Sequence, residues 1–246
     1  EVTFDHVSFA YPGQIGNVLS DITFIARAGE TVAILGSTGS GKSTLISLIP
    51  RLYDASAGSV RIDGRDVRAY HLNTLRGAIG VALQESVLFT GTIEENLRWG
   101  DENASPEEIR HAAAIAQADP FVEKLAEGYQ TELGQRGVNL SGGQKQRLCI
   151  ARALAKHPRI LILDDSTSAV DLATEAEIQK GLRGAFGDMT VFIIAQRISS
   201  VMDADRILVM ENGRVIDSGK HEELKKRCEV YREIVVSQLG EEAARA

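Results

Sequence analysis

Short apolar runs bounded by glycine and polar turns occur in the first and last thirds of the chain, and a helical pattern occupies the middle. Residues 1–9 alternate between apolar and polar positions, as a half-exposed strand does. Residues 31–35 (TVAIL) lie between two glycines and indicate a buried strand. Similar runs predict further buried strands at 159–164, 190–195 and 206–210.

Two stretches show helical spacing with recognisable ends. Residues 42–49 (KSTLISLI) carry apolar residues three and four positions apart and stop before a proline. Further along, Ser105 is suited to cap a helix, with Pro106 at the first helical position and Glu108 three residues after the cap. The sequence that follows is rich in Ala, Glu, Ile and Leu, so we expect a helical region over about 85–157.

Turn dipeptides connect several of the expected strands. The segment GSVRIDG (58–64) alternates and closes on Asp-Gly, and Asn212-Gly213 joins the last apolar run to RVID as a hairpin. Short apolar strands that alternate with helices predict a mostly parallel sheet covered on both faces. The final segment, 221–246, is expected to form one or two amphipathic helices that pack against the core.

The composition is that of an ordinary globular protein, with 43% hydrophobic and 25% charged residues among 246. The formal net charge of −7 argues weakly against a nucleic-acid-binding surface. The two cysteines, Cys149 and Cys228, form no Cys-x-x-Cys pair, which favours a reducing compartment, and the histidines show no ligand spacing. No apolar run approaches the roughly 20 residues of a membrane span. Because the chain starts at Glu1 rather than methionine, we expect a fragment of a longer protein.

Residues 36–44 (GSTGSGKST) satisfy the pattern Gly-x-x-x-x-Gly-Lys-Ser between an expected strand and an expected helix. The glycines let successive backbone N–H groups point at phosphate, and the helix start adds a partial positive charge. Lys42 can reach the β and γ phosphates and Ser43 can bind Mg²⁺. A glycine-rich turn with a chance lysine is the alternative, which the strand–loop–helix context disfavours. The expected phosphate contacts are Gly36, Ser37, Thr38, Gly39, Ser40, Gly41, Lys42, Ser43 and Thr44.

The segment LILDDSTSAVD (161–171) begins with the end of an expected buried strand, which is followed by two acids and then a polar turn. In a chain with a phosphate loop, an aspartate at such a strand end holds Mg²⁺, usually through water, and we expect Asp164 to do so. A solvated strand end is the alternative interpretation. Adjacent side chains on a strand point to opposite faces, so Asp165 must have a different role.

The pentapeptide LSGGQ (140–144), followed by KQRLCIARAL, is more specific than either phosphate motif. With it, essentially the whole chain resembles the nucleotide-binding domain of an ATP-binding cassette (ABC) transporter. The resemblance implies a single cassette over 1–246 with an α/β P-loop NTPase (RecA-like) fold. Its mostly parallel sheet core and N-terminal antiparallel β subdomain would lie at 1–84 and 158–246, with an inserted α-helical subdomain at about 85–157.

The same resemblance implies roles for further residues. Tyr11, in FAYPG, would stack on adenine, and Gln84, in VALQES, would reach Mg²⁺ and face the membrane domain. Two cassettes of this family pair head to tail, so each ATP lies between the phosphate loop of one and the LSGGQ of the other. SAVD (168–171) would cross that dimer interface. The residues that contact the partner's nucleotide would be Ser141, Gly142, Gly143 and Gln144.

The cofactors implied are ATP and Mg²⁺, with Ser43, Gln84 and Asp164 as metal ligands. Two segments are typical of exporter-type cassettes fused behind a transmembrane domain, TELGQRG (131–137) and ESVLFTGTIEENL (85–97).

Two residues depart from the family pattern at the hydrolysis step. The residue after the Mg²⁺ aspartate is usually a glutamate that polarises the attacking water, and Asp165 is shorter by one methylene, about 1.5 Å of reach. Gln196, in IIAQRISS, stands where the family usually has histidine, and its amide can donate a hydrogen bond but cannot titrate. With Lys42 these two residues form the expected catalytic set. A third departure is Gln135, where GERG is usual.

These departures predict a site that binds ATP and hydrolyses it slowly, while the intact LSGGQ serves a competent site on a different partner chain. The alternative is a homodimer in which Asp165 suffices. A non-transport ABC ATPase, a regulatory ATP-binding module and an importer subunit are less favoured. The favoured function is the ATP-binding domain of an exporter at the cytoplasmic face of the cell membrane. Its partners would be a second cassette and a transmembrane domain fused N-terminally, with no nucleic acid.

Overall fold

The alternating pattern at the N-terminus forms an antiparallel sheet in a computed structural model that describes residues 1–185 and 187–240. Its strand order is β2-β1-β4-β5, and the phenyl rings of Phe4 and Phe24 stack inside it with centroids 4.7 Å apart. The Asp63-Gly64 turn joins the last two strands, as predicted. The bounds are β1 Val2–Phe9, β2 Leu19–Ala26, β4 Ala57–Ile62 and β5 Arg65–Asp66.

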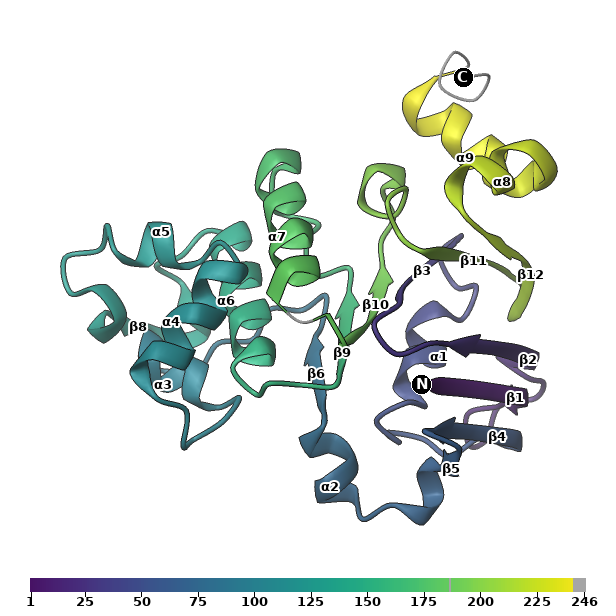
Figure 1. The fold of residues 1–246 in the computed structure, drawn as a ribbon, viewed down its shortest axis with the longest axis horizontal. Helices are drawn as coiled ribbons and strands as arrows, with labels where there is room; N and C mark the ends of the chain where they lie inside the picture. Colours follow the sequence, from purple (N-terminus) through teal and green to yellow (C-terminus); the bar gives the residue numbers. More distant parts are fainter. Residues whose placement is uncertain (186, 241–246) are drawn as a thin grey trace. The chain divides into compact units, whose positions relative to one another are not determined.

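The chain divides into two compact units, and this antiparallel sheet belongs to the first, which comprises Glu1–Arg76 and the segment from Thr190 onward. The first unit also holds β3, which runs parallel to β10 on one side and to β11 on the other, with β12 antiparallel at the edge (Figure 1). The apolar runs predicted these strands, and the residues of β3 and β10 are almost all buried. Their bounds are β3 Thr31–Gly36, β10 Thr190–Ile194, β11 Arg206–Glu211 and β12 Arg214–Gly219.

Short helices complete the first unit. Helix α1 begins at Lys42, as the sequence predicts, and helices α8 and α9 follow the last strand. The expected C-terminal helices are confirmed up to residue 239, and 241–246 lie outside the described residues. The bounds are α1 Lys42–Ser47, α2 Leu72–Gly77 at the boundary between the units, α8 His221–Arg227 and α9 Glu229–Leu239.

The second unit, Gly77–Met189, is mostly helical and contains two parallel strands, β6 and β9. Ser105 caps α4 with the reciprocal Glu108 hydrogen bond and Pro106 at the helix start, as predicted. The unit extends beyond the helical segment expected at 85–157 because β6, β9 and α7 belong to it. The bounds are β6 Ile79–Ala82, β7 Gly91–Thr92, α3 Ile93–Arg98, α4 Pro106–Ile115, α5 Asp119–Val122, β8 Glu132–Leu133, α6 Gly142–Leu154, β9 Ile160–Asp164 and α7 Leu172–Ala185.

The predicted fold class, an α/β fold with a largely parallel sheet, is confirmed. Within the described residues no helix combines the length and the apolar character needed to cross a membrane. The carboxyl end of β3 leads into the glycine-rich phosphate loop, and that of β9 leads into the acidic segment. The sequence predicts nucleotide-binding residues in both segments.

Candidate nucleotide-binding site

The glycine-rich loop turns between β3 and α1 in a conformation that its sequence requires. Gly41 has a φ of 97°, a left-handed conformation that residues with a side chain rarely adopt. A Cβ there would lie 2.8 Å from Leu19 Cδ2 and 3.2 Å from the Val18 carbonyl oxygen. The loop therefore fits closely against the start of β2, and only glycine allows it at this position.

Lys42 lies over the beginning of the same loop. Its ammonium group donates hydrogen bonds to the carbonyl oxygens of Gly36 and Ser37, both at 2.8 Å. Ser40, inside the loop, has a buried hydroxyl without a hydrogen-bond partner among the described residues. A cation and an unused hydroxyl within one turn suit a polyanionic ligand that would draw the lysine outward.

A cavity of about 400 Å³ opens beside this loop, within the size range of small-molecule sites. Its walls come from the first unit alone: the phosphate loop, Gln196 after β10, the end of β11, and helix α9. Of the residues predicted from the sequence, it brings together Gly36, Ser37, Thr38, Lys42 and Gln196.

Tyr11, predicted to stack on adenine, is fixed beside α1. Its hydroxyl shares a hydrogen bond of 2.9 Å with the Thr44 hydroxyl. The rings of Phe9 and Tyr53 meet it edge to face, with centroids 4.9 and 5.2 Å away. These contacts and the hydrogen bond to Thr44 fix the position of the Tyr11 ring.

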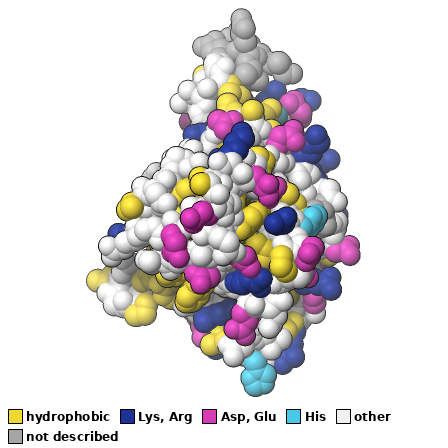
Figure 2. Space-filling view, turned by 90° about the vertical axis from the view of Figure 1, so that its left-hand side faces the viewer, with side chains coloured by type: hydrophobic (Ala, Val, Ile, Leu, Met, Phe, Trp, Pro, Cys, Tyr) yellow, Lys and Arg dark blue, Asp and Glu magenta, His cyan; other side chains and the backbone are white. Residues whose placement is uncertain are grey.

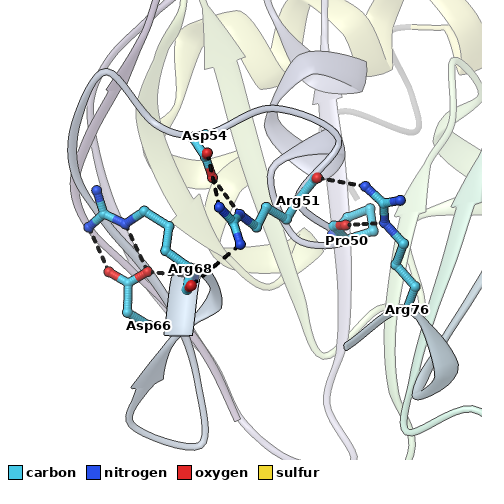
Figure 3. Close-up of polar contacts among 6 residues, drawn as sticks. All are labelled: Pro50, Arg51, Asp54, Asp66, Arg68 and Arg76. Atoms are coloured by element: carbon cyan, nitrogen blue, oxygen red, sulfur yellow. Dashed lines mark hydrogen bonds and ion pairs between the residues drawn. The ribbon is translucent and has the colours of Figure 1, made fainter. Parts of the chain in front are cut away.

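The turn after α1 is held by arginines, as Figure 3 shows. Arg76 donates to the carbonyl oxygens of Pro50 and Arg51, at 3.1 and 2.9 Å. Arg51 in turn donates to both oxygens of Asp54, at 2.7 and 3.3 Å, and this pairing lowers the pKa of the Asp54 carboxyl. The helix that begins at the phosphate loop thus ends in a braced turn.

In the second unit, Asp164 and Asp165 stand where β9 ends, and both side chains are buried. The backbone turns at Asp165 with φ 49°, in the left-handed region that aspartate tolerates better than most residues. The next residue, Ser166, has a buried hydroxyl with no hydrogen-bond partner among the described residues. The strand thus delivers two carboxylates, and next to them a polar group that protein neighbours leave unsatisfied.

The LSGGQ segment is the start of helix α6, locked by a capping box. The Ser141 hydroxyl accepts from the Gln144 backbone N–H, and the Gln144 side chain accepts from the Ser141 N–H. Gly143 allows the SAVD loop to come close, because a Cβ there would lie 2.7 Å from the Ala169 carbonyl oxygen. The two segments predicted to face a partner cassette are therefore packed against each other.

Gln146, a residue outside the sequence motifs, fixes this contact. Its Nε2 donates to the Ser168 hydroxyl at 2.9 Å, and its Oε1 accepts from the Ala169 N–H at 2.8 Å. The side chain is only 5% exposed. The signal that could have found it is a glutamine on the apolar face of the helix that follows LSGGQ, where a buried amide needs partners.

Gln84 lies two residues after the end of β6 and is exposed. The segment after it carries two exposed aromatic residues, Phe89 and Trp99, whose rings stack with centroids 4.7 Å apart. Asn96, fully buried, holds the Phe89 backbone by accepting from its N–H at 2.8 Å and donating to its carbonyl oxygen at 2.9 Å. This segment therefore presents an exposed apolar surface whose backbone is held in place by Asn96.

The predicted site residues thus form two groups. The phosphate loop, Lys42, Tyr11 and Gln196 belong to the first unit, and Gln84, the acidic strand end and LSGGQ belong to the second. The contacts of the described residues offer no explanation for Gln135. On the side of the molecule shown in Figure 2, acidic and basic side chains are interspersed, and those described form no basic stripe of the kind that binds nucleic acid.

Comparisons with known proteins agree with these motifs. Residues 19–168 match the family described as ABC transporter. The chain is 50% identical over 243 residues to the uncharacterized ABC transporter ATP-binding protein YfiB of Bacillus subtilis, covering 99% of this chain and 42% of that protein. It is 46% identical over 237 residues to the putative multidrug export ATP-binding/permease protein YgaD of the same organism, covering 96% of this chain and 41% of that protein.

A solved structure titled as a bacterial Atm1-family ABC exporter with ATP bound is also similar. It matches with a TM-score of 0.93 and 42% identity, over 98% of this chain and 42% of that one. The chain thus spans about two fifths of the length of these relatives. Sequence motifs, fold and relatives lead to one conclusion: the chain belongs to the ABC transporter family as a nucleotide-binding domain, and ATP hydrolysis is the general activity of that family.

Proposed function

We propose that this chain is the ATP-binding domain of an exporter whose own phosphate-loop site binds Mg·ATP and hydrolyses it slowly, while its LSGGQ serves the competent site of a different cassette. The observation that carries the proposal is the pair Asp165 and Gln196. Every group needed to bind nucleotide is present, and the two that depart from the family pattern are those that act on water and on the γ-phosphate.

The donor set suits a nucleotide triphosphate. Lys42 and the loop N–H groups would bind the β and γ phosphates, and Tyr11 would stack on the base. Ser43, Gln84 and Asp164 would hold Mg²⁺, which when bound neutralises charge on the β and γ phosphates. The unsatisfied hydroxyls of Ser40 and Ser166, one in each group of site residues, support a polar ligand at both.

Hydrolysis requires a water positioned in line with the γ-phosphate and a group that takes up its proton. Asp165 would do this with a carboxylate about 1.5 Å shorter in reach than glutamate. A misplacement of about 1 Å can lower the rate about 100-fold. Gln196 would donate a hydrogen bond to the γ-phosphate without supplying the positive charge that a histidine can carry.

The signature side of the chain favours an active partner. Ser141 and Gln144 cap α6 reciprocally, and Gln146 fixes the neighbouring SAVD loop, so this surface keeps a defined geometry. A chain whose own site is weakened but whose signature is intact is explained economically by a heterodimer. The partner would carry glutamate and histidine at the positions of Asp165 and Gln196.

Two observations support a membrane partner. The relative YgaD is named a multidrug export ATP-binding/permease protein, and the chain covers only 41% of it. The surface after Gln84, with Phe89 and Trp99 stacked and exposed, suits docking of membrane-domain helices. We place the cassette at the cytoplasmic face of the cell membrane, behind an N-terminally fused transmembrane domain, with ATP binding and release coupled to export.

The proposal is tested by replacing Asp165 and Gln196 with the residues that the family usually has at these positions. We expect the double variant Asp165→Glu with Gln196→His to raise steady-state Mg·ATP turnover by about 10- to 100-fold, because it returns the reach and the charge. Lys42→Ala is the blank, since it removes phosphate binding. Nucleotide affinity, measured with a fluorescent ATP analogue, should change little in the double variant.

Turnover should be measured over a range of chain concentrations. If wild-type turnover exceeds the blank and rises faster than linearly with concentration, the chain pairs with itself and Asp165 is adequate, which would support the homodimer instead. If the double variant gains nothing while its nucleotide affinity and concentration-dependent pairing are intact, the slow-site proposal is wrong.

A further inference from the structure

The C-terminal helix contacts the segment that carries Gln196. Gln238, in the last turn of α9, accepts a hydrogen bond from the Ile198 backbone N–H at 2.8 Å through Oε1. Its Nε2 donates to the Gln196 carbonyl oxygen at 2.7 Å. One planar amide thus pairs with a donor and an acceptor two residues apart, as a neighbouring strand would.

Packing sets where this amide lies. Tyr231 and Val235, on the same helical face at intervals of three to four residues as Gln238, are completely buried. Ile198, at the other end of the contact, is also completely buried. The Tyr231 hydroxyl shares a hydrogen bond of 2.6 Å with His221 Nδ1 of α8, so α9 is also held to the preceding helix.

The contact borders the candidate site. Gln238, Ser237 and Glu233 of α9 line the same cavity as Lys42, Gln196 and the phosphate loop, and that cavity lies wholly within the first unit. Residues 196 and 197 follow β10 and are exposed, and the Gln238 amide holds the Gln196 backbone from the side of α9. A hydrogen bond to its carbonyl oxygen therefore restricts the direction in which its side chain can point.

We propose that Gln238 is a positioning residue that holds the Gln196 backbone so that the Gln196 amide faces the γ-phosphate. The inference rests on the proposed function, because it assumes that this cavity receives the phosphates. It makes α9 part of the nucleotide-sensing apparatus of the cassette, and not only a cover for the core. It also predicts that the contact affects the affinity for ATP, which has a γ-phosphate, and not the affinity for ADP.

The test is the ratio of ATP to ADP affinity in the purified chain, measured by displacement of a fluorescent nucleotide with Mg²⁺ present. Gln238→Ala removes both hydrogen bonds. Gln238→Glu has the same shape and keeps an acceptor for the Ile198 N–H, but it turns a second oxygen toward the Gln196 carbonyl oxygen. Val236→Ala, an exposed change on the same helix, is the matched control.

We expect both Gln238 variants to lower the ATP-to-ADP affinity ratio about fivefold, the effect of one hydrogen bond, and Val236→Ala to leave it unchanged. Hydrogen exchange adds an independent readout. The Ile198 amide should exchange faster in Gln238→Ala and stay protected in Gln238→Glu. A purely structural role for α9 would alter the affinities for both nucleotides equally, or neither.

The outcomes separate this inference from the proposal on which it rests. If wild-type ATP binding is absent, or is unaffected by Lys42→Ala, the proposed nucleotide site fails and the positioning role fails with it. If wild-type binding depends on Lys42 and both Gln238 variants keep the wild-type ratio within about twofold, the positioning role alone is wrong.

Discussion

Two glutamines, one in each compact unit, hold a functional loop in the same way but in different surroundings. Gln146 binds Ser168 and the Ala169 N–H from inside the second unit, where it is 5% exposed. Gln238 is itself exposed and binds the backbone of the exposed Gln196 and of the buried Ile198 in the first unit. Both use the donor and the acceptor of one amide.

Burial decides what each contact can do. When a buried amide such as that of Gln146 loses its partners, it is left without water, and the full desolvation penalty appears. When an exposed hydrogen bond is broken, water replaces it and the net loss is small. The Gln146 contact should therefore behave as a fixed part of the fold. The Gln238 contact should behave as a reversible restraint, suited to a segment that responds to nucleotide.

The largest expected effect comes from breaking the buried contact. Gln146→Ala should lower the free energy of unfolding by about 2–4 kcal/mol, since it leaves a cavity and removes both hydrogen bonds to the SAVD loop. Gln144→Ala, the same change two residues earlier and less buried, should cost only about 0.5–1 kcal/mol through the lost capping box. Denaturant unfolding of both variants measures the difference. Equal losses in the two would contradict the assignment of Gln146 as a buried clamp.

A smaller effect is expected from the glycine that lets the SAVD loop approach. In Gly143→Ala the new Cβ would lie 2.7 Å from the Ala169 carbonyl oxygen, a backbone atom that cannot easily move. We expect a net destabilisation of about 1–2 kcal/mol, because overpacking outweighs the better helix propensity of alanine.

Gly142→Ala is the matched control for this change. Its nearest contact would be the Ala169 methyl group at 3.3 Å, which can shift slightly. Its stability should stay near that of the wild type, as thermal unfolding can check. If Gly142→Ala were the more harmful of the two, the close packing of LSGGQ against SAVD would be wrong.

Several other features of the fold and the site could be predicted from the sequence alone. The capped start of α4 and the hairpin turn at Asn212-Gly213 were predicted because their interactions join residues within a few positions. The phosphate loop was predicted for the same reason, since its glycines, lysine and hydroxyls are contiguous. The spacing of the residues is enough to indicate local interactions of this kind.

The partners of the two glutamine clamps could not be found in that way. Gln146 joins residues 22 and 23 positions away, and Gln238 joins residues 40 and 42 positions away. Which backbone groups they meet depends on how each helix packs, and amphipathic spacing gives only the buried face of a helix. The division of the site residues between two units likewise depends on tertiary contacts that no motif encodes.

The smallest expected effect is a pH dependence confined to the exposed contact. Burial lowers the pKa of His221 from its ordinary value, with Lys225 acting in the same direction and the carboxylates of Glu222 and Asp203 opposing. Between the folded and the unfolded pKa the unfolded chain binds more protons, so stability rises with pH there. Acidification from about pH 7.5 to about pH 5.5 should therefore weaken the joint between α8 and α9.

The physical reason is that the His221 ring shares a hydrogen bond with the Tyr231 hydroxyl at a largely buried position, where a charged imidazolium is less stable than the neutral ring. We expect hydrogen exchange at the Ile198 amide, corrected for intrinsic rates, to quicken at acid pH, while the Ala169 amide held by Gln146 stays protected. His221→Gln should abolish this difference. His6 cannot imitate the effect, since Asp21 raises its pKa and gives its titration the opposite sign. Parallel acid loosening at both amides would mean that the two contacts do not differ as their burial implies.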